Sequence, residues 1–155
     1  MAGIRFTFEF EGEAQIDRTL LNVTENVQDA TVLWEELADR FARVETRQFK
    51  TQGAYGSGGW QELSPRYAAW KARHYPGKPI LQRTGALVKS LTRRPFGVEV
   101  ITPASMTVGS GLDYGRRHQA GGGSLPRRRP VELPEGERRY WVTLIQRFIR
   151  RGHTA

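Results

Sequence analysis

Hydrophobic and polar residues alternate at the start of the chain. Ile4, Phe6, Phe8 and Phe10 occupy every second position, and Gly12 follows them. An alternation of period two predicts a strand with one buried face, ended by the glycine. A face with three phenylalanines must be covered, so we expect it to meet a helix, a neighbouring strand or another subunit.

The pattern then changes to the spacing of a helix. Apolar residues recur at intervals of three and four, at Ile16, Leu20, Val23, Val27, Ala30, Trp34, Leu37, Phe41 and Val44. Such a stripe predicts amphipathic helix. One helix over residues 13–49 would be about 55 Å long, which is excessive for this chain. Because residues 22–31 are weak helix formers, we expect a break there and a second helix near 30–49.

The middle of the chain contains a glycine-rich segment, residues 51–59, and two short predicted helices. The glycine-rich segment is typical of a loop. The first helix is expected to run from Ser64 and Pro65, an N-cap and a first-turn residue, to the Pro-Gly pair at 76–77. The second is expected to begin after Thr84. The notable side chains on these two helices are Tyr67, Trp70, Lys71, Leu87 and Leu91.

Two strands and a C-terminal helix follow. Residues 98–102 and 106–108 alternate like strands and are joined by a turn. Residues 112–119 are expected to form a turn or short helix, and 129–133 an extended edge segment, because Pro130 cannot donate to a central ladder. A final helix has acidic residues in its first turn and basic residues in its last, which suits the helix dipole. Its apolar face comprises Trp141, Leu144, Ile145, Phe148 and Ile149.

The order of these elements predicts the fold class. We expect an α+β fold, with a small, mainly antiparallel sheet packed with N-terminal helices and a C-terminal helix. The 155 residues suit a single domain over 1–155. Because Gly121–Ser124 is flexible by composition, a flexible loop is expected near 119–129. No apolar run approaches the ~20 residues of a membrane span and no signal peptide is evident, so no membrane partner is expected.

The net charge of +8 is unevenly distributed. Residues 1–49 carry five basic and ten acidic side chains, residues 50–115 nine and three, and residues 116–155 ten and three. The excess suits a polyanionic partner. The first third of the chain is acidic and the rest is basic, so the acidic part of one copy suits docking on the basic part of a neighbour. The alternative is that the chain has two solvated faces of opposite charge. The lack of cysteine excludes disulfides and thiolate chemistry and fits a reducing cytoplasm.

The sequence lacks the common catalytic and metal-binding patterns. His74, His118 and His153 have no partner at a metal-ligand spacing. Neither Ser57 nor Ser110 lies in a nucleophile elbow, and no phosphate-binding glycine loop is present. We therefore expect no enzyme, no catalytic residue, no metal and no cofactor.

Arginines around the glycine-rich stretch at 121–124 are the best candidates for a binding site. They are suited to contacting phosphates, and Tyr114 to stacking on a base. The sequence contains no recognised nucleic-acid-binding module. A basic nucleic-acid-binding protein is therefore kept only as the alternative hypothesis. The candidates are Arg116, Arg117, Arg127, Arg128 and Arg129.

Four blocks, in order, resemble one family. They are Trp60–Pro65 with Lys71, residues 80–87 with Ser90, Tyr114 with residues 118–121, and residues 126–133. In this order and spacing they resemble the virion morphogenesis proteins of tailed phages, which include Mu-like G proteins and tail-completion S proteins. The chain departs from the family pattern at Gly115, where alanine is usual, and in the fourth block, which lacks a phenylalanine.

The resemblance implies a non-enzymatic structural subunit of a phage particle. Such proteins complete the tail or join it to the head, usually as a ring. We therefore expect a homo-oligomeric ring, with six as the expected number of subunits, in the neck or at the tail end of the virion, assembled in the host cytoplasm. The expected partners are other copies of the chain, the neck or connector and tail-tube proteins, and the genomic DNA as it passes.

The resemblance also assigns roles to the motif residues, which are Trp60, Leu63, Thr84, Gly85, Leu87, Tyr114, His118, Gln119 and Gly121. The tryptophan and the two leucines are expected in the core. Thr84 and Gly85 are expected to cap a helix, and His118 and Gln119 to form hydrogen bonds in a turn. Gly121–Ser124 is expected to act as a hinge. Arg127–Arg129 is then a docking segment for carboxylates of a neighbouring subunit or tail protein, a role that we favour over DNA contact.

Overall fold

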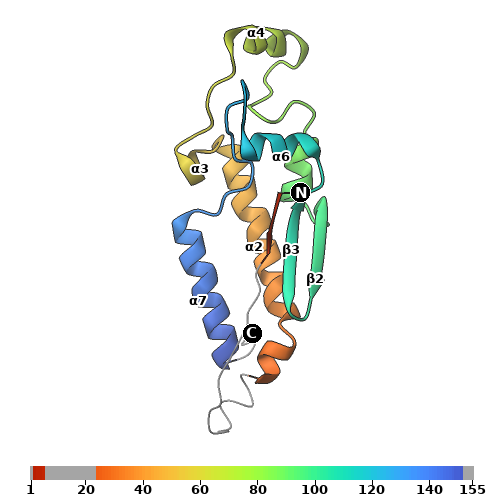
Figure 1. Ribbon diagram of the computed structural model, residues 1–155, viewed down its shortest axis with the longest axis vertical. Coiled ribbons are helices and arrows are strands. Elements are labelled where there is room, and N and C mark those ends of the chain that lie inside the picture. Colours follow the sequence, from red (N-terminus) through yellow and green to blue (C-terminus); the bar gives the residue numbers. More distant parts are fainter. Residues whose placement is uncertain (1, 6–23, 152–155) are drawn as a thin grey trace.

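The computed structural model describes residues 2–5 and 24–151, which form an elongated α+β structure (Figure 1). Residues 24–28 form a short helical segment. The remaining elements are β1 (Ala2–Arg5), α2 (Thr31–Lys50), α3 (Ala54–Ser57), α4 (Pro65–His74), α5 (Ala86–Thr92), β2 (Val98–Thr102), β3 (Ser105–Ser110), α6 (Asp113–Ala120) and α7 (Glu135–Arg151). The predicted α+β class, with an antiparallel sheet packed with helices, is confirmed.

The sheet has three antiparallel strands in the order β1-β3-β2. In β1, Ile4 pairs with Val108 of β3, and Val108 also pairs with Glu99 of β2. The predicted hairpin of β2 and β3 is therefore confirmed. Of the predicted first strand, residues 4 and 5 belong to β1, whereas residues 6–10 lie outside the described residues.

The expected break in the N-terminal helical stripe lies at Asp29 and Ala30. The Asp29 carboxylate accepts a hydrogen bond from the Thr31 amide at 2.9 Å, and the Ala30 amide donates to the Pro103 carbonyl at 2.9 Å. These contacts satisfy amides that the start of a helix leaves without partners. The break and the second helix are confirmed, while the stripe before residue 24 lies outside the described residues.

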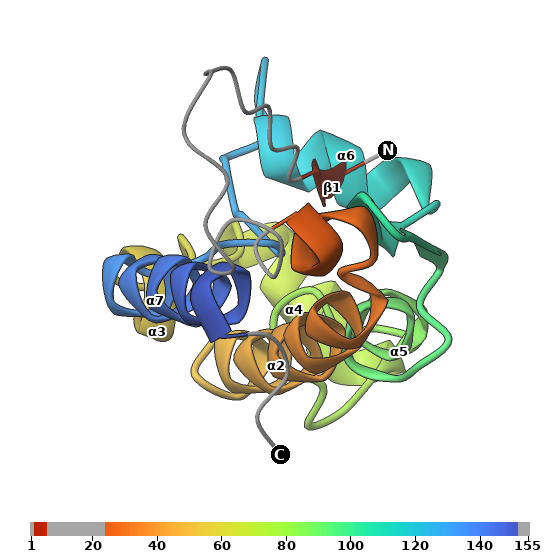
Figure 2. The same ribbon diagram turned by 90° about the horizontal axis from the view of Figure 1, so that it is seen from below.

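Helix α2 is the centre of the hydrophobic core. It contacts α7, α5, β2 and β3, and the views along two axes show α7 on one side of it and α5 on the other (Figures 1 and 2). Phe41 of α2 meets Phe96 edge to face, with ring centroids 5.3 Å apart. The predicted stripes of both long helices are buried, with Leu33, Trp34, Leu37, Phe41 and Val44 from α2 and Trp141, Leu144, Ile145 and Phe148 from α7.

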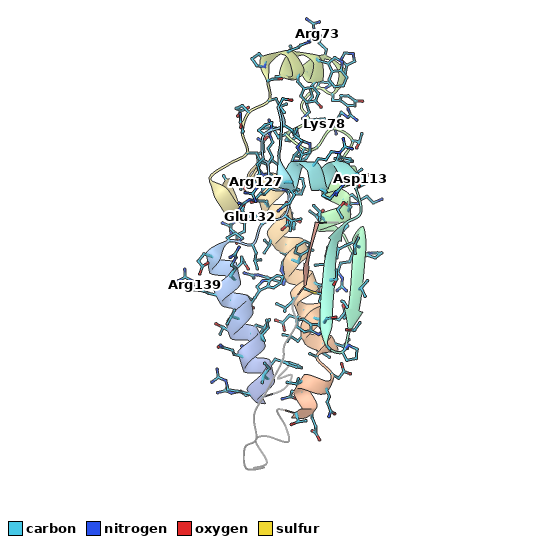
Figure 3. The ribbon with its side chains drawn as sticks, in the orientation of Figure 1. Arg73, Lys78, Asp113, Arg127, Glu132 and Arg139 are labelled. Carbon is cyan, nitrogen blue, oxygen red and sulfur yellow. The ribbon has the colours of Figure 1, made fainter. Side chains whose placement is uncertain are left out.

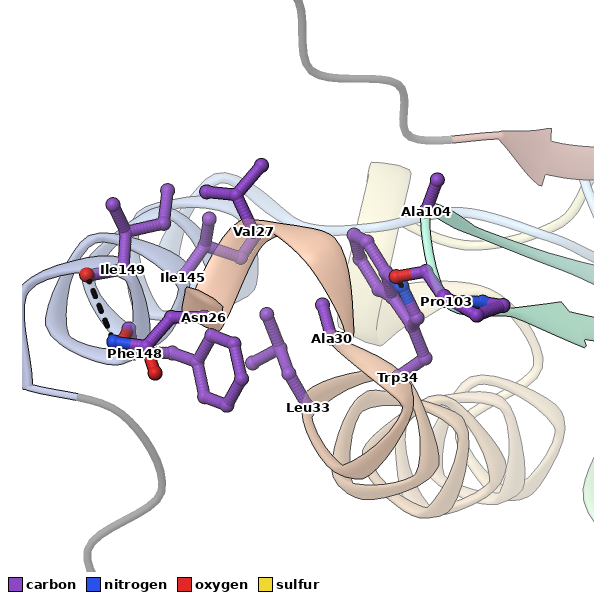
Figure 4. A pocket seen from close by; sticks show the side chains of 10 residues that line it. All are labelled: Asn26, Val27, Ala30, Leu33, Trp34, Pro103, Ala104, Ile145, Phe148 and Ile149. Atoms are coloured by element: carbon purple, nitrogen blue, oxygen red, sulfur yellow. Dashed lines mark hydrogen bonds between the residues drawn. The ribbon is translucent and has the colours of Figure 1, made fainter. Parts of the chain in front are cut away.

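A small apolar hollow of about 40 Å³ lies at the lower end of the core (Figure 4). Asn26 spans its edge, and its side-chain amide donates to the carbonyls of Phe148 and Ile149, each at 3.2 Å. This amide satisfies carbonyls in the last turn of α7, which the helix itself leaves without partners. The hollow therefore lies beside a structural joint between residues 24–28 and α7.

The glycine-rich segment 51–59 is more ordered than composition suggests, because it contains the short helix α3. Gly53 precedes α3 with φ of +87°, and a Cβ atom there would lie 2.4 Å from the Trp60 ring. The Gln48 side chain accepts a hydrogen bond from the Gly56 amide at 3.0 Å. The prediction of a plain loop was wrong because these contacts come from residues outside the segment.

Candidate protein-interaction site

The four sequence blocks meet around one cleft at the end of the molecule where α4 lies (Figure 1). The cleft has a volume of about 760 Å³ and opens between the α4 segment, α6 and the loop after α6. Of the motif residues, Leu63, Thr84, Tyr114 and His118 line it, together with Arg128. Sequence positions up to about 65 residues apart are thus brought to one place by the fold.

Trp60 and Leu87 are core residues, as the sequence predicts. Trp60 is buried, meets Phe49 edge to face at 5.3 Å, and donates from its indole nitrogen to the Arg129 carbonyl at 2.9 Å. Leu87 is buried beneath Gly115, where an added Cβ would lie 2.9 Å from a Leu87 methyl group. Glycine at 115, where the family pattern has alanine, therefore permits a close approach of α6 to α5.

The residues expected to cap a helix, Thr84 and Gly85, lie at the start of α5. Gly85 is the N-cap residue, with φ of +80°, a left-handed conformation that glycine adopts without steric cost. The Thr84 hydroxyl accepts a hydrogen bond from the Ala86 amide at 3.4 Å. Leu63 is half-buried and packs on the edge of the core, so it contributes both to the core and to the cleft.

Gln119 binds the backbone of a distant residue with both ends of its amide. Its nitrogen donates to the Val131 carbonyl at 2.8 Å, and its oxygen accepts from the Val131 amide at 3.1 Å. The Gln119 side chain thus takes the hydrogen bonds that a neighbouring strand would make with the Val131 backbone. No strand forms at residues 129–133. The prediction of an extended edge segment paired in the sheet was therefore wrong, whereas hydrogen bonding by Gln119 is confirmed.

The loop after α6 is positioned by glycine and by backbone hydrogen bonds. Gly121 has φ of +69°, and a Cβ there would lie 2.9–3.0 Å from atoms of Arg127. Gly122 and Leu125 form an isolated β-bridge across the turn. The Arg128 amide donates to the His118 carbonyl at 3.0 Å. The described loop has a defined path, and its flexibility stays a prediction.

The three consecutive arginines have different environments. Arg128 is only 5% exposed, and its guanidinium donates to the carbonyls of Gln61 at 2.6 Å and Glu62 at 2.8 Å. Arg129 pairs with Glu132 at 2.9 Å. Arg127 is exposed and donates to the Gln119 carbonyl at 3.2 Å. The expectation that all three are free for docking was wrong for Arg128, because it fastens residues 61 and 62 to the loop.

Arg116 and Arg117 lie on α6 and are exposed, so the structure leaves them available to a partner. Figure 3 shows Arg127 on the loop close to α6. Tyr114, also on α6, is 41% exposed and lines the cleft. These residues, rather than the whole arginine run, form the accessible part of the site predicted from the sequence.

His118, which lines the cleft, has a buried ring nitrogen, Nδ1, without a hydrogen-bond partner among the described residues. Burial lowers the pKa of His118, and the positive charge of Arg128 lowers it further. The lowered pKa favours the neutral ring. The expected side-chain hydrogen bond of His118 in a turn is not found at Nδ1 among the described residues.

Replacement of Arg128 with methionine should loosen this end of the molecule. We expect the free energy of unfolding to fall by about 1–2 kcal/mol, because two charge-assisted hydrogen bonds to carbonyls are lost while the aliphatic packing is kept. Thermal unfolding measures the change, and Arg127→Met is the matched control because Arg127 is exposed. Equal effects of the two substitutions would contradict the role of Arg128 as a clamp.

Sequence reasoning missed the exposed face of α4. Its only buried residue is Lys71, whose ammonium group donates to the Pro79 carbonyl. Tyr67 and Trp70 are each 39% exposed and stack on one another with centroids 5.5 Å apart, and Trp70 stacks on His74 at 4.7 Å. The detectable signal was an aromatic stripe on a helix that has no leucine, isoleucine or valine to bury.

Two kinds of site are not found in the described part of the chain. In residues 2–5 and 24–151, no three histidine, cysteine, aspartate or glutamate side chains are grouped to hold a metal ion. None of the described helices is long and apolar enough to cross a membrane. The candidate site itself is a cleft with basic and aromatic residues around it, among them Arg83, Tyr67 and Tyr114.

The chain thus has an α+β fold with a cleft, exposed arginines and exposed aromatic residues at one end. Residues 12–141 match the model of the phage virion morphogenesis family, and the chain belongs to this family. The match spans all four sequence blocks and confirms the resemblance drawn from them. No curated protein and no solved structure shows significant similarity to the chain.

Proposed function

We propose that the protein is a structural subunit that completes the tail or joins it to the head, as a ring at the neck or tail end of the particle. Membership of the virion morphogenesis family is the observation that carries this proposal. The shape of the subunit supports it, since a long core of α2, α7 and the sheet presents an exposed interaction end at α4. Identical subunits in a ring use two different surfaces, which an elongated subunit provides.

The charge division of the sequence supports the ring less directly. Within the described residues, the α2 carboxylates Glu35 and Asp39 are paired with Arg94 of the same subunit, at 2.5 and 3.0 Å. Arg94 also pairs with Glu99, so one positive charge serves three carboxylates and the cluster stays acidic. In the proposed ring, this acidic face of α2 suits a basic loop of the next subunit.

Native mass spectrometry of the purified protein and imaging of virions test the ring. We expect a closed ring of about six copies, in solution or on the particle, located at the neck or tail end. A stable monomer that occurs in no ring of the particle would refute the proposal.

The alternative is a basic nucleic-acid-binding protein. Binding to duplex DNA, measured against salt concentration, separates the two functions. Tight, sequence-dependent binding at physiological salt would favour the alternative, whereas weak binding that disappears with salt supports the structural role.

A further inference from the structure

The exposed face of α4 is basic and aromatic. Residues 64–83 contain five basic side chains and no acidic one. Arg66, Tyr67, Trp70 and Arg73 are exposed and follow the spacing of a helix, so they share one surface, the basic face of α4. The guanidinium groups of Arg66 and Arg73 have no hydrogen-bond or ion-pair partner in the described part of the chain. Exposed tyrosine, tryptophan and arginine often dominate the binding energy of protein interfaces.

The first half of α2 has an exposed face of the opposite charge. Residues 24–39 contain five acidic side chains and no basic one. Val32, Glu35, Glu36 and Asp39 follow helical spacing and form the acidic face of α2. Val32 is 49% exposed, so this face also offers apolar surface to a partner.

The acidic face keeps an excess of negative charge within the subunit. Arg94 pairs with Glu35, Asp39 and Glu99, so a single guanidinium serves three carboxylates. Glu36 has no ion-pair or hydrogen-bond partner among the residues that the structure describes. The side chains of Glu35 and Asp39 remain 48% and 57% exposed, which leaves both carboxylates accessible to a second cation.

The two faces are complementary but lie apart in one subunit. Figure 1 shows α4 at one end of the molecule and the start of α2 near the other end. A contact between the two faces therefore requires a second copy of the chain. The stripes over residues 32–39 and 66–73 have equal length, about two helical turns, and each combines charge with apolar or aromatic surface. Charge complementarity of this kind fixes which surfaces of two molecules meet.

We propose that the basic face of α4 in one copy packs against the acidic face of α2 in the next copy of the ring. Trp70 packs on the exposed Val32, and the two arginines pair with carboxylates of the acidic face. Because the two faces differ, the same contact repeats from copy to copy around the ring. This inference rests on the proposed function, because that function supplies the ring.

A photo-crosslinking amino acid at position 69 tests the contact in cells that produce the phage. Ala69 is exposed, and it neighbours Arg66 and Arg73 on the surface of α4, at spacings of three and four residues. We expect a crosslink between two copies of the chain, mapped to residues 32–39. A crosslink only to a different protein or to DNA would overturn the inference, as would the absence of a crosslink in assembled particles.

Reversal of charge on each face supplies the second measurement. Arg66→Glu with Arg73→Glu should lower the yield of the crosslink about tenfold or more, because like charges then meet across the contact. Glu35→Arg with Glu36→Arg should do the same. The four substitutions together should restore most of the yield, since the charges are again complementary. A fourfold variant that crosslinks no better than either double variant would contradict the contact.

Two further variants control for effects on folding. Glu36→Arg alone removes no ion pair within the described part of the subunit, so we expect it to fold normally and to lower the crosslink yield less than the double variant. Arg147→Glu with Arg150→Glu reverses two exposed charges on α7 and should leave the yield unchanged. Circular dichroism checks that each variant is folded.

The outcomes separate this inference from the proposed function. If the chain forms a ring in purified particles and position 69 crosslinks elsewhere, the inference fails and the proposed function stands. If the wild-type chain is not found in purified particles at all, both fail.

Discussion

Replacement of Glu137 with alanine should destabilise the protein by about 3 kcal/mol, because the substitution leaves a partly buried guanidinium without its partner. Glu137, in the first turn of α7, is 7% exposed. It accepts hydrogen bonds from Arg40 of α2 at 2.8 and 2.9 Å and from the Tyr55 hydroxyl at 2.7 Å. This carboxylate therefore joins three segments that are far apart in the sequence.

Chemical denaturation at pH 7 measures the loss. Glu135→Ala is the control, since Glu135 is exposed in the same turn and lies 3.8 Å from Arg139, so its removal should change stability by less than about 0.5 kcal/mol. A loss for Glu137→Ala no larger than that of the control would show that the network contributes nothing.

Glu137 also makes the stability of the protein depend on pH. Hydrogen bonds from Arg40 hold the pKa of Glu137 below its ordinary value of 4.5 and Tyr55 assists, although burial acts in the opposite direction. A lowered pKa in the folded state means that stability is fully present above pH 4.5 and is lost as pH falls through the folded pKa. The difference between wild type and Glu137→Ala should therefore shrink below pH 4.5.

Replacement of Glu45 with glutamine should have the opposite effect and stabilise the protein at pH 8, by about 2–3 kcal/mol. Glu45 lies on α2 and is 1% exposed. Burial raises its pKa well above the ordinary value of 4.5; the nearby Glu132 carboxylate adds to this, while the Glu132 backbone acts against it. Glutamine keeps the shape of the side chain and removes the charge that burial disfavours.

The pH dependence distinguishes this explanation from a simple packing effect. Because the folded-state pKa is raised, stability is fully present below pH 4.5 and is lost as pH rises from there towards the folded pKa. The advantage of Glu45→Gln should therefore be small at pH 4 and grow with pH. Unfolding at several pH values measures it, with the exposed Glu25→Gln as control, and an advantage that does not vary with pH would contradict the prediction.

The sequence by itself determined the two long helices α2 and α7, the hairpin and the family. The stripes of α2 and α7 follow the helical period, because a long helix on a core must bury one face, and this requirement is visible in residue order. The break before α2 was expected from the weak helix formers at residues 22–31, and it lies at Asp29 and Ala30. Motif blocks such as WQELSP carried the resemblance that the family match confirms.

The candidate site depended more on tertiary structure. Arg127, Arg128 and Arg129 are equivalent by composition, yet only Arg128 is buried, because its partners are the carbonyls of residues 61 and 62. Backbone carbonyls have no sequence signature, so no pattern could predict this clamp. Gln119 likewise takes the place of a neighbouring strand for Val131, which a period-two pattern cannot anticipate.

The exposure of α4 was also decided only by the fold. Tyr67 and Trp70 would ordinarily be expected in a core, and their spacing suits a buried helical face. They remain exposed because none of the described helices and strands makes more than slight contact with α4, whose only buried residue is Lys71. Burial of a residue depends on what packs against it, and that is a property of the assembled chain rather than of the local sequence.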